Sequence, residues 1–319
     1  MNPVKEINEM LDNCLSADIS DVHIETFRDF FRVRYREDGL LRLWRTYSLP
    51  AREQFFTRLK IMAGLDTNRY GLQDGRFTYK ERDVRLAVMP VFQGEKIVLR
   101  ILSSTLRLTL SELGLPGPAL VSLRANIRRP AGLLLVTGPT GSGKTTTLYS
   151  LLKLLDCAQK NIVTIEDPIE YQLPGINQVQ INAARELDFA SVLRAVLRQD
   201  PDIIFIGEIR DEITARIAVR AALTGHLVLA TLHTRDTQEA FARLLDLGIA
   251  EYLLRAVLLA VLSQRLYRRL CAADPRGFRG RSGFFEYRSF TDQVFYSFEQ
   301  SRQDILQQGL TIPDELQIC

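Results

Sequence analysis

The fold of this chain is decided by residues 138–145, which read Gly138-Pro139-Thr140-Gly141-Ser142-Gly143-Lys144-Thr145. This stretch fills every fixed position of the phosphate-binding pattern G-x-x-x-x-G-K-[ST]. An apolar run at 132–137 precedes it and is typical of a buried strand, while residues 146–155 suit a helix. A strand, a glycine loop and a helix in this order direct backbone N–H groups at a phosphate. The sequence therefore predicts a nucleoside triphosphate site.

Each part of the loop has an expected role. The glycines let the backbone curl around the anion. Lys144 reaches the terminal phosphates, and the Thr145 hydroxyl binds Mg²⁺. The expected nucleotide-binding set is Gly138, Pro139, Thr140, Gly141, Ser142, Gly143, Lys144, Thr145 and Thr146. ATP is expected rather than GTP, because the sequence contains no Asn-Lys-x-Asp segment that would select guanine. The alternative, a glycine-rich turn between two core elements, fits the complete pattern less well.

The composition excludes several classes of protein. The chain has 319 residues, 46% hydrophobic and 25% charged, which is ordinary for a globular protein of one or two domains. Its formal net charge of +3 is too small to indicate a nucleic-acid or membrane-surface partner. The four cysteines form no C-x-x-C pair, so neither disulfides nor a zinc site is expected. Its apolar runs fall short of the ~20 residues of a membrane span. We expect a cytoplasmic protein that reaches a membrane only through partners.

The pattern along the chain indicates two domains. We expect an N-terminal α+β domain at residues 1–105, a linker at 106–117 and an α/β domain at 118–319. Helices are expected at 5–14 and 52–63, and strands at 21–25, 30–35, 75–79, 84–89 and 97–102. In the second domain, continuous apolar runs at 162–165, 203–206 and 227–232 alternate with helical sequence, which is typical of a parallel sheet covered on both faces. After residue 239 the chain is expected to be mainly helical, notably at 250–270.

Carboxylates follow two of these strands. Glu166 and Glu170 lie in the segment after 162–165, and Glu208 follows 203–206 and one glycine. Open α/β sheets place their sites at the carboxyl ends of the strands. The three carboxylates of this segment, Glu166, Asp167 and Glu170, suit general-base and metal chemistry. At Glu208 we expect either a water-mediated Mg²⁺ contact or orientation of the attacking water. The alternatives are a solvated acidic turn and a helix-capping glutamate.

Histidines and arginines supply the remaining candidates. His226 and His233 bracket the strand at 227–232, and packing or capping is the alternative role for each. Two histidines without further ligands at suitable spacing do not indicate zinc. Arg76, Arg85 and Arg100 lie on or beside strands of the first domain. Each alone suggests a surface residue, but together they are candidate arginine fingers from a neighbouring domain or subunit.

Taken in order, these segments resemble the secretion and pilus-assembly ATPases, the hexameric motors of type II secretion and type IV pili. The marks are the phosphate loop at 138–146, an aspartate box at 164–170, a Walker B segment ending in Gly-Glu within 197–211 and a histidine box at 224–234. Segments 20–25 and 73–76 match the N-terminal domain of the family. The resemblance extends from about residue 16 to about residue 287.

The resemblance implies a PAS-like domain joined to a RecA-like P-loop NTPase core, assembled as a homohexamer. It implies phosphate and Mg²⁺ binding by Lys144 and Thr145, and a Walker B acid at Glu208. The other implied roles are a general base at Glu166, the histidine-box pair His226 and His233, and phosphate-sensing arginines at Arg76, Arg85 and Arg100. The implied partners are a polytopic membrane platform protein and, indirectly, pilin-like subunits, with no direct contact to nucleic acid.

Two departures from the family pattern refine this expectation. Residues 268–271 are Arg-Arg-Leu-Cys, and the tetracysteine zinc loop of many secretion members does not follow them, so no zinc is expected. The chain also begins almost at the PAS-like domain. This short form resembles the ATPases of competence (DNA-uptake) pili in Gram-positive bacteria, which implies a motor that assembles such a pilus from the inner face of the plasma membrane. The alternatives are a secretion ATPase of another type II-like system, a RecA-like nucleic-acid motor and a weakly hydrolysing nucleotide-binding regulator.

Overall fold

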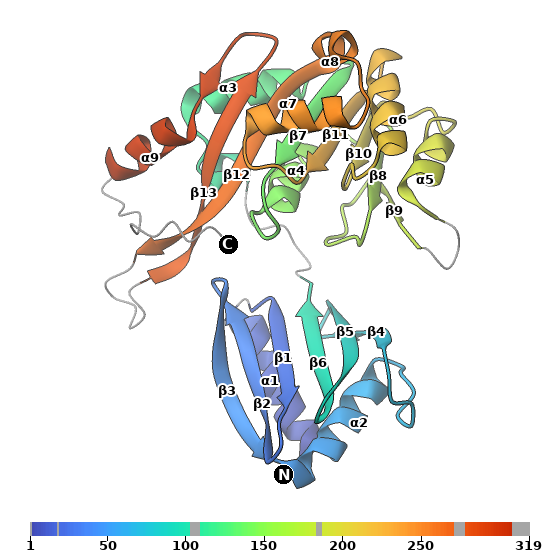
Figure 1. Cartoon of the computed structure of the whole chain (residues 1–319), viewed down its shortest axis with the longest axis vertical. Helices are drawn as coiled ribbons and strands as arrows, with labels where there is room; N and C mark the ends of the chain where they lie inside the picture. The colour runs from blue at the N-terminus through green and yellow to red at the C-terminus, as the bar shows by residue number, and fades with distance from the viewer. Residues whose placement is uncertain (1, 18, 103–108, 183–186, 271–277, 308–319) are drawn as a thin grey trace. The chain divides into compact units, whose positions relative to one another are not determined.

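The computed structural model describes residues 2–17, 19–102, 109–182, 187–270 and 278–307 (Figure 1). The chain divides into two compact units, Met1–Thr105 and Leu106–Cys319. Each unit has a sheet and a hydrophobic core of its own. The segment 271–277, where the sequence lacks the zinc loop, lies outside the described residues.

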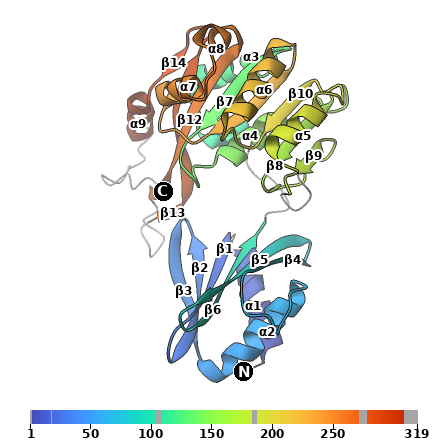
Figure 2. The same cartoon turned by 45° about the vertical axis from the view of Figure 1, so that its right-hand side comes forward.

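Unit 1 is a six-stranded antiparallel sheet with helices on one face (Figure 2). The strand order is β3-β2-β1-β6-β5-β4. The helices are α1 (Pro3–Ser16) and α2 (Arg52–Met62), with a short 3₁₀ turn η1 (Leu49–Ala51) before α2. The strands are β1 (Asp21–Thr26), β2 (Phe30–Glu37), β3 (Leu40–Ser48), β4 (Gln73–Tyr79), β5 (Arg82–Val91) and β6 (Gly94–Ile101). The expected helices and strands are present, and β3 is an additional strand at the edge of the sheet.

Alternation along the strands determines the two faces of this sheet. In β5, Val84, Leu86 and Val88 are buried and pack in one cluster with Ile7 of α1 and Phe55 of α2. Residues between them in sequence point to the other face, because successive side chains of a strand alternate. That second face contains mainly charged side chains.

Unit 2 is an eight-stranded sheet of order β14-β13-β12-β7-β11-β10-β8-β9. The strands from β12 to β9 run parallel, and β13 and β14 continue the sheet antiparallel. The parallel strands are β7 (Gly132–Thr137), β8 (Ile162–Glu166), β9 (Asn177–Gln180), β10 (Ile203–Ile206), β11 (Leu227–Leu232) and β12 (Leu258–Leu270). The antiparallel strands are β13 (Phe278–Ser289) and β14 (Phe295–Tyr296).

Helices cover both faces of this sheet (Figure 1). One core cluster joins the sheet to η2 (Leu110–Leu113), α3 (Gly117–Asn126) and α4 (Lys144–Leu152). The other joins it to α5 (Phe189–Val196), α6 (Glu212–Leu223), α7 (Thr237–Asp246) and α8 (Glu251–Val257). Helix α9 (Phe298–Gln307) packs against β13. Every side chain of β7, β8, β10 and β11 is buried, so the predicted doubly covered parallel sheet is confirmed.

The prediction of a helix over 250–270 is wrong beyond residue 257. Helix α8 ends there, and the chain continues as β12, pairing parallel with β7 and antiparallel with β13. Residues 257–264 are buried without interruption. A short apolar run of this kind has no period that separates a central strand from a buried helix. Hydrogen bonding to β7 on one side and to β13 on the other stabilises this segment as a strand.

The start of unit 2 packs into its core. Leu110, Leu113 and Leu115 are buried against α3 and α4, although the sequence suggested a linker at 106–117. Thr109 and Glu112 form a capping box that begins η2. No helix within the described ranges is both long and apolar enough to cross a membrane.

Candidate nucleotide site

The phosphate loop connects β7 to α4 with a backbone that requires glycine. Gly138, Gly141 and Gly143 have φ values of 146°, 80° and 86°, which L side chains rarely adopt. A Cβ on Gly138 would also overlap the carbonyl oxygen of Gln264 in β12. Gly143 is the N-cap of α4, so the loop ends where the free N–H groups of the helix begin. This is the geometry that receives a phosphate.

Lys144 lies folded over the loop. The residue is only 9% exposed, and its Nζ donates to the carbonyl oxygens of Gly138 (2.8 Å) and Pro139 (3.0 Å). Burial lowers the Lys144 pKa to about 8, although the charges of Glu208 and Glu170 oppose that shift. An ammonium group in this position gains most from an anion that replaces its lost hydration.

The loop fits a polyphosphate on two further observations. Ser142 Oγ is fully buried, and within the part of the chain that the structure describes it has no hydrogen-bond partner. Such a hydroxyl needs a ligand or water to avoid the cost of desolvation. Thr145 follows Lys144 in the first turn of α4. No cluster of three or more His, Cys, Asp or Glu side chains able to hold a metal is found among the described residues.

Glu208 and His233 meet beside Lys144. Glu208 follows β10, His233 follows β11, and His233 Nε2 lies 3.4 Å from Glu208 Oε1. Arg210 Nε donates to the other carboxylate oxygen at 2.7 Å. Burial and the positive charge of Lys144 lower the His233 pKa, and Glu208 opposes this shift. The structure therefore brings Lys144, Glu208 and His233 together at the carboxyl edge of the sheet.

Glu166 is a buried carboxylate. It ends β8 and is 3% exposed. One carboxylate oxygen accepts from Tyr149 Oη, and the other from Thr164 Oγ1 at 2.5 Å and Gln178 Nε2 at 3.1 Å. Burial raises the Glu166 pKa despite these donors. A general base must face the water that it activates, and here both oxygens of Glu166 are held by protein donors.

Glu170 differs from Glu166 in its relation to Lys144. Its charge acts on Lys144, as that of Glu208 does. Glu170 belongs to the same acidic segment as Glu166, four residues further along the chain. The Glu170 charge thus favours the protonated form of Lys144.

His226 lies at the opposite edge of the sheet. It precedes β11, whose six residues separate it from His233, a length of about 20 Å for a strand. Its backbone oxygen accepts from the N–H of Gly132 at the start of β7, and its Nδ1 lies 3.0 Å from the Ala221 carbonyl oxygen. The phosphate loop is at the other end of β7, so His226 does not join the cluster around Lys144.

The three arginines of unit 1 form one row across its sheet. Arg76 pairs with Arg85 between β4 and β5, and Arg85 pairs with Arg100 between β5 and β6. Arg100 also donates to Asp21 Oδ1 of β1 at 2.9 Å. Their side chains share the charged face of the sheet, since Val84 and Leu86 on either side of Arg85 are buried. Residues scattered over 25 positions in sequence thus form one basic row.

Several supporting residues were not predicted from the sequence. Gln264 of β12 accepts a hydrogen bond from Thr147 in α4, and Thr137 bonds with Thr234 across β7 and β11. Tyr149 supports Glu166 from α4. Apart from Thr234, which ends the histidine box, these residues belong to no local motif. Only knowing which strands are neighbours brings them to the site.

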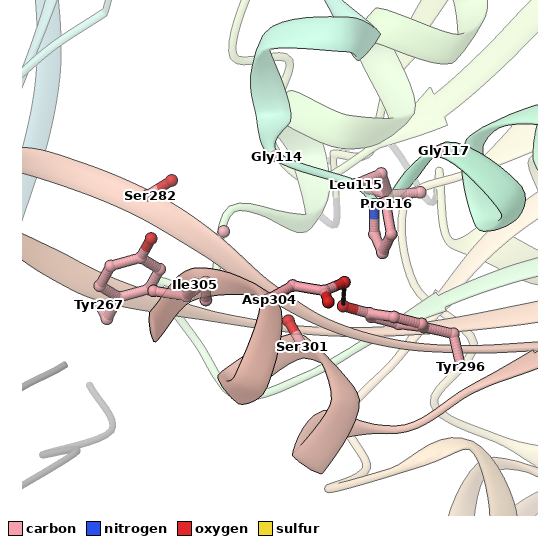
Figure 3. A pocket seen from close by; sticks show the side chains of 11 residues that line it. Gly114, Leu115, Pro116, Gly117, Tyr267, Ser282, Tyr296, Ser301, Asp304 and Ile305 are labelled. Carbon is pink, nitrogen blue, oxygen red and sulfur yellow. Dashed lines mark hydrogen bonds between the residues drawn. The ribbon is translucent and has the colours of Figure 1, made fainter. Parts of the chain in front are cut away.

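A cavity of about 240 Å³ lies elsewhere in unit 2 (Figure 3). Its wall is formed by the segment 114–117, by Tyr267 and Ser282 of the β12–β13 pair, and by α9 with Tyr296. Tyr296 Oη donates to Asp304 Oδ2 at 2.6 Å. None of the residues expected to bind nucleotide lines this cavity.

The fold and the site define a class of protein, the P-loop ATPases with a parallel central sheet. The family model of the type II/IV secretion system proteins matches residues 2–308, so the chain belongs to that family. It is 45% identical to the type II secretion system protein HxcR of Pseudomonas aeruginosa over 324 residues, covering 94% of this chain and 69% of the relative. It is 49% identical to the type IV pilus assembly ATPase PilB of Myxococcus xanthus over 277 residues, covering 85% of this chain and 49% of that protein.

Solved structures agree with this assignment. The crystal structure of the pilus retraction motor PilT with bound ADP has a TM-score of 0.71 and 29% identity, covering 94% of this chain and 87% of that one. The ATPase DotB of Legionella pneumophila has a TM-score of 0.79 at 22% identity, covering 98% and 94%, which shows the fold alone. The α/β class and the activity of an ATP hydrolase are thereby confirmed. The chain spans between 49% and 69% of the two relatives' lengths.

Proposed function

We propose that this chain is a Mg²⁺-dependent motor ATPase that drives assembly of a filament of pilin-like subunits from the inner face of a membrane. The observation that supports it best is the meeting of Lys144, Glu208 and His233 beside a glycine loop that fits a polyphosphate. A motor needs such a site to distinguish ATP from its products. A motor also needs a second element that changes position when ATP is hydrolysed. We propose the arginine row of unit 1, Arg76, Arg85 and Arg100, for this role.

Residues of this chain would divide the chemistry as follows. Lys144 binds the terminal phosphates, and Thr145 and Glu208 hold Mg²⁺, Glu208 through water. When bound, Mg²⁺ neutralises charge that develops on the phosphates. His233 contacts Glu208 and would help to hold its carboxylate in place. For the base, the family resemblance implies Glu166. Because protein donors hold both oxygens of Glu166, we propose that Glu170, four residues further along the same segment, takes this role.

The proposed assembly is a homohexamer attached through a polytopic membrane platform protein. Its support is family membership, since the relatives include a pilus assembly ATPase and a type II secretion protein. The test is the mass of the chain in solution with and without ATP, together with steady-state phosphate release. A six-subunit species that hydrolyses ATP supports the motor. A monomer that binds ATP without turnover, even at high concentration, supports a regulator instead.

The finer proposal is a competence pilus used for DNA uptake. It is supported by the sequence at 268–277, which resembles the competence ATPases in lacking the tetracysteine loop. The second candidate, a type II secretion motor, is favoured by the 45% identity to HxcR. Deleting the gene in its host separates them: loss of DNA uptake with normal protein secretion supports the pilus, and the reverse result supports secretion. DNA-stimulated, salt-sensitive ATP turnover would instead indicate a nucleic-acid motor.

A further inference from the structure

Strand β12 places one buried glutamine against both ends of the phosphate loop. Gln264 is 2% exposed, and its Oε1 accepts from Thr147 Oγ1 at 2.6 Å. Its backbone oxygen fills the space that a Cβ of Gly138 would occupy. Its side-chain Nε2 lies 2.8 Å from the position that a Cβ of Gly143 would occupy. A single residue thus touches the first glycine of the loop, the last glycine and the first turn of α4.

The bond between Gln264 and Thr147 is isolated from water. Thr147 is fully buried, so its hydroxyl depends on Gln264 as the acceptor. Loss of either partner leaves the other as an unsatisfied polar group in the core, which costs more than the bond itself contributes. Residues 143 and 147 lie on the same face of the helix start, one turn apart. The amide therefore fixes the first turn of α4 relative to β12.

The neighbours of Gln264 hold the segment that follows His233. Ser263 Oγ and Arg265 Nη2 both donate to the carbonyl oxygen of Arg235, at 3.1 and 3.2 Å. They point to the opposite face of β12 from Gln264, because side chains alternate along a strand. Three consecutive residues of β12 (Figure 1) therefore contact the phosphate loop on one side and the chain after His233 on the other.

We propose that Gln264 is a positioning residue that holds the phosphate loop in its nucleotide-binding conformation through Thr147. This inference rests on nucleotide binding at the loop. Gln264 acts on Lys144 and the α4 N–H groups by fixing the backbone on which they lie. Ser263 and Arg265 keep the His233 segment in register with the same strand.

The test measures the affinity for ADP with Mg²⁺ in five variants: Gln264→Met, Thr147→Val, their double mutant, Thr147→Ser and Ser122→Ala. Methionine keeps the length of glutamine without its amide. Thr147→Ser keeps the hydroxyl donor. Ser122→Ala is the matched control, since it removes a buried hydroxyl that bonds Tyr287 in the same unit, away from the loop.

We expect Gln264→Met and Thr147→Val each to weaken ADP binding about tenfold, as the loss of one buried hydrogen bond implies. The ADP affinity of the double mutant should be no lower than that of the single mutant with the lower affinity, because the two substitutions remove the same bond. Thr147→Ser and Ser122→Ala should bind like the wild type. Nucleotide-free Gln264→Met should stay folded at the assay temperature, although its thermal midpoint falls further than that of Ser122→Ala, because Thr147 loses its acceptor while Tyr287 keeps the donor Asn126.

Three results would overturn the proposal. Wild-type affinity in both Gln264→Met and Thr147→Val would show that the bond does not position the loop. Losses that add in the double mutant would show that the two residues act independently. A loss of affinity in Ser122→Ala as large as in Gln264→Met would show general destabilisation. Failure of the wild-type chain to bind ADP would instead reject the nucleotide site itself.

Discussion

His233 Nε2 lies 3.4 Å from Glu208 Oε1, so two side chains that follow neighbouring parallel strands contact each other. The charge of Glu208 favours the protonated form of Lys144, and the charge of Lys144 lowers the His233 pKa. A phosphate bound beside Lys144 would change both interactions at once. The contact is therefore the part of the site best placed to respond to the γ-phosphate.

Replacing Lys144 should abolish nucleotide binding while the fold survives. In Lys144→Ala the loop loses the cation that faces the phosphates, and the hydrogen bonds lost within the described residues are those to two backbone carbonyls. We expect ADP affinity to fall by more than 100-fold with an unchanged circular dichroism spectrum. ATP turnover near the wild-type rate in this variant would remove the loop from the mechanism.

Nucleotide affinity should fall as the pH rises above about 8. Burial depresses the Lys144 pKa from 10.5 to about 8, so the nucleotide-free protein loses this proton there. Bound phosphates favour the charged form, so binding above that pH must take up a proton, and affinity should fall by up to tenfold per pH unit. Calorimetric titration between pH 7 and 9.5 in two buffers counts this proton. A pH-dependent proton uptake that persists in Lys144→Arg would assign it to another group.

The carboxylates should separate binding from turnover. In Glu208→Gln and Glu170→Gln we expect ATP affinity within about threefold of wild type and phosphate release reduced at least 100-fold. An amide at position 170 cannot accept a proton, and an amide at position 208 lacks the charge that orders Mg²⁺ and its water. Glu166→Gln should retain more activity than Glu170→Gln, since Tyr149 and Thr164 hold its oxygens in the core. Exposed Glu251 on α8 supplies the control, Glu251→Gln. The reverse order for Glu166 and Glu170 would restore Glu166 as the base.

The two histidines should behave differently within one subunit. His233→Gln is expected to slow turnover at least tenfold, because it removes the partner of Glu208. His226→Gln is expected to leave nucleotide affinity unchanged, since His226 lies at the opposite edge of the sheet. Equal losses of ADP affinity in both variants would contradict this separation. The measurement is ADP titration and phosphate release in parallel.

The arginine row provides the test of coupling between the units. If one of Arg76, Arg85 and Arg100 acts as a finger, its alanine variant should lose roughly 10³–10⁵ in turnover. ATP affinity should fall less, because the phosphate loop is intact. Arg36→Ala is the matched control, since Arg36 pairs with Asp21 in the same row across the sheet. Normal turnover in all three arginine variants would show that unit 1 takes no part in hydrolysis.

Much of the site could be predicted because its signals are local. The loop at 138–145 has a fixed pattern, and the buried strands before Glu166 and Glu208 are continuous apolar runs. The sequence analysis grouped His226 with His233, but His226 precedes the parallel strand β11 and therefore lies at its amino end, away from the phosphate loop. The sequence at 258–270 was misjudged because pairing with β7 and β13, not periodicity, makes it a strand. Gln264 has no local signal, because only that pairing brings it to the loop.

The bond between Thr147 and Gln264 joins residues 117 positions apart. During synthesis, the loop and α4 therefore leave the ribosome long before the strand that supports them. Contacts between such distant segments form late, since closing the intervening chain costs entropy that local contacts do not. The parallel strands up to β11 can assemble earlier without completing the site. The ability to bind ADP should consequently arise near the end of folding. Nucleotide should therefore bind the fully folded unit and not its folding intermediates.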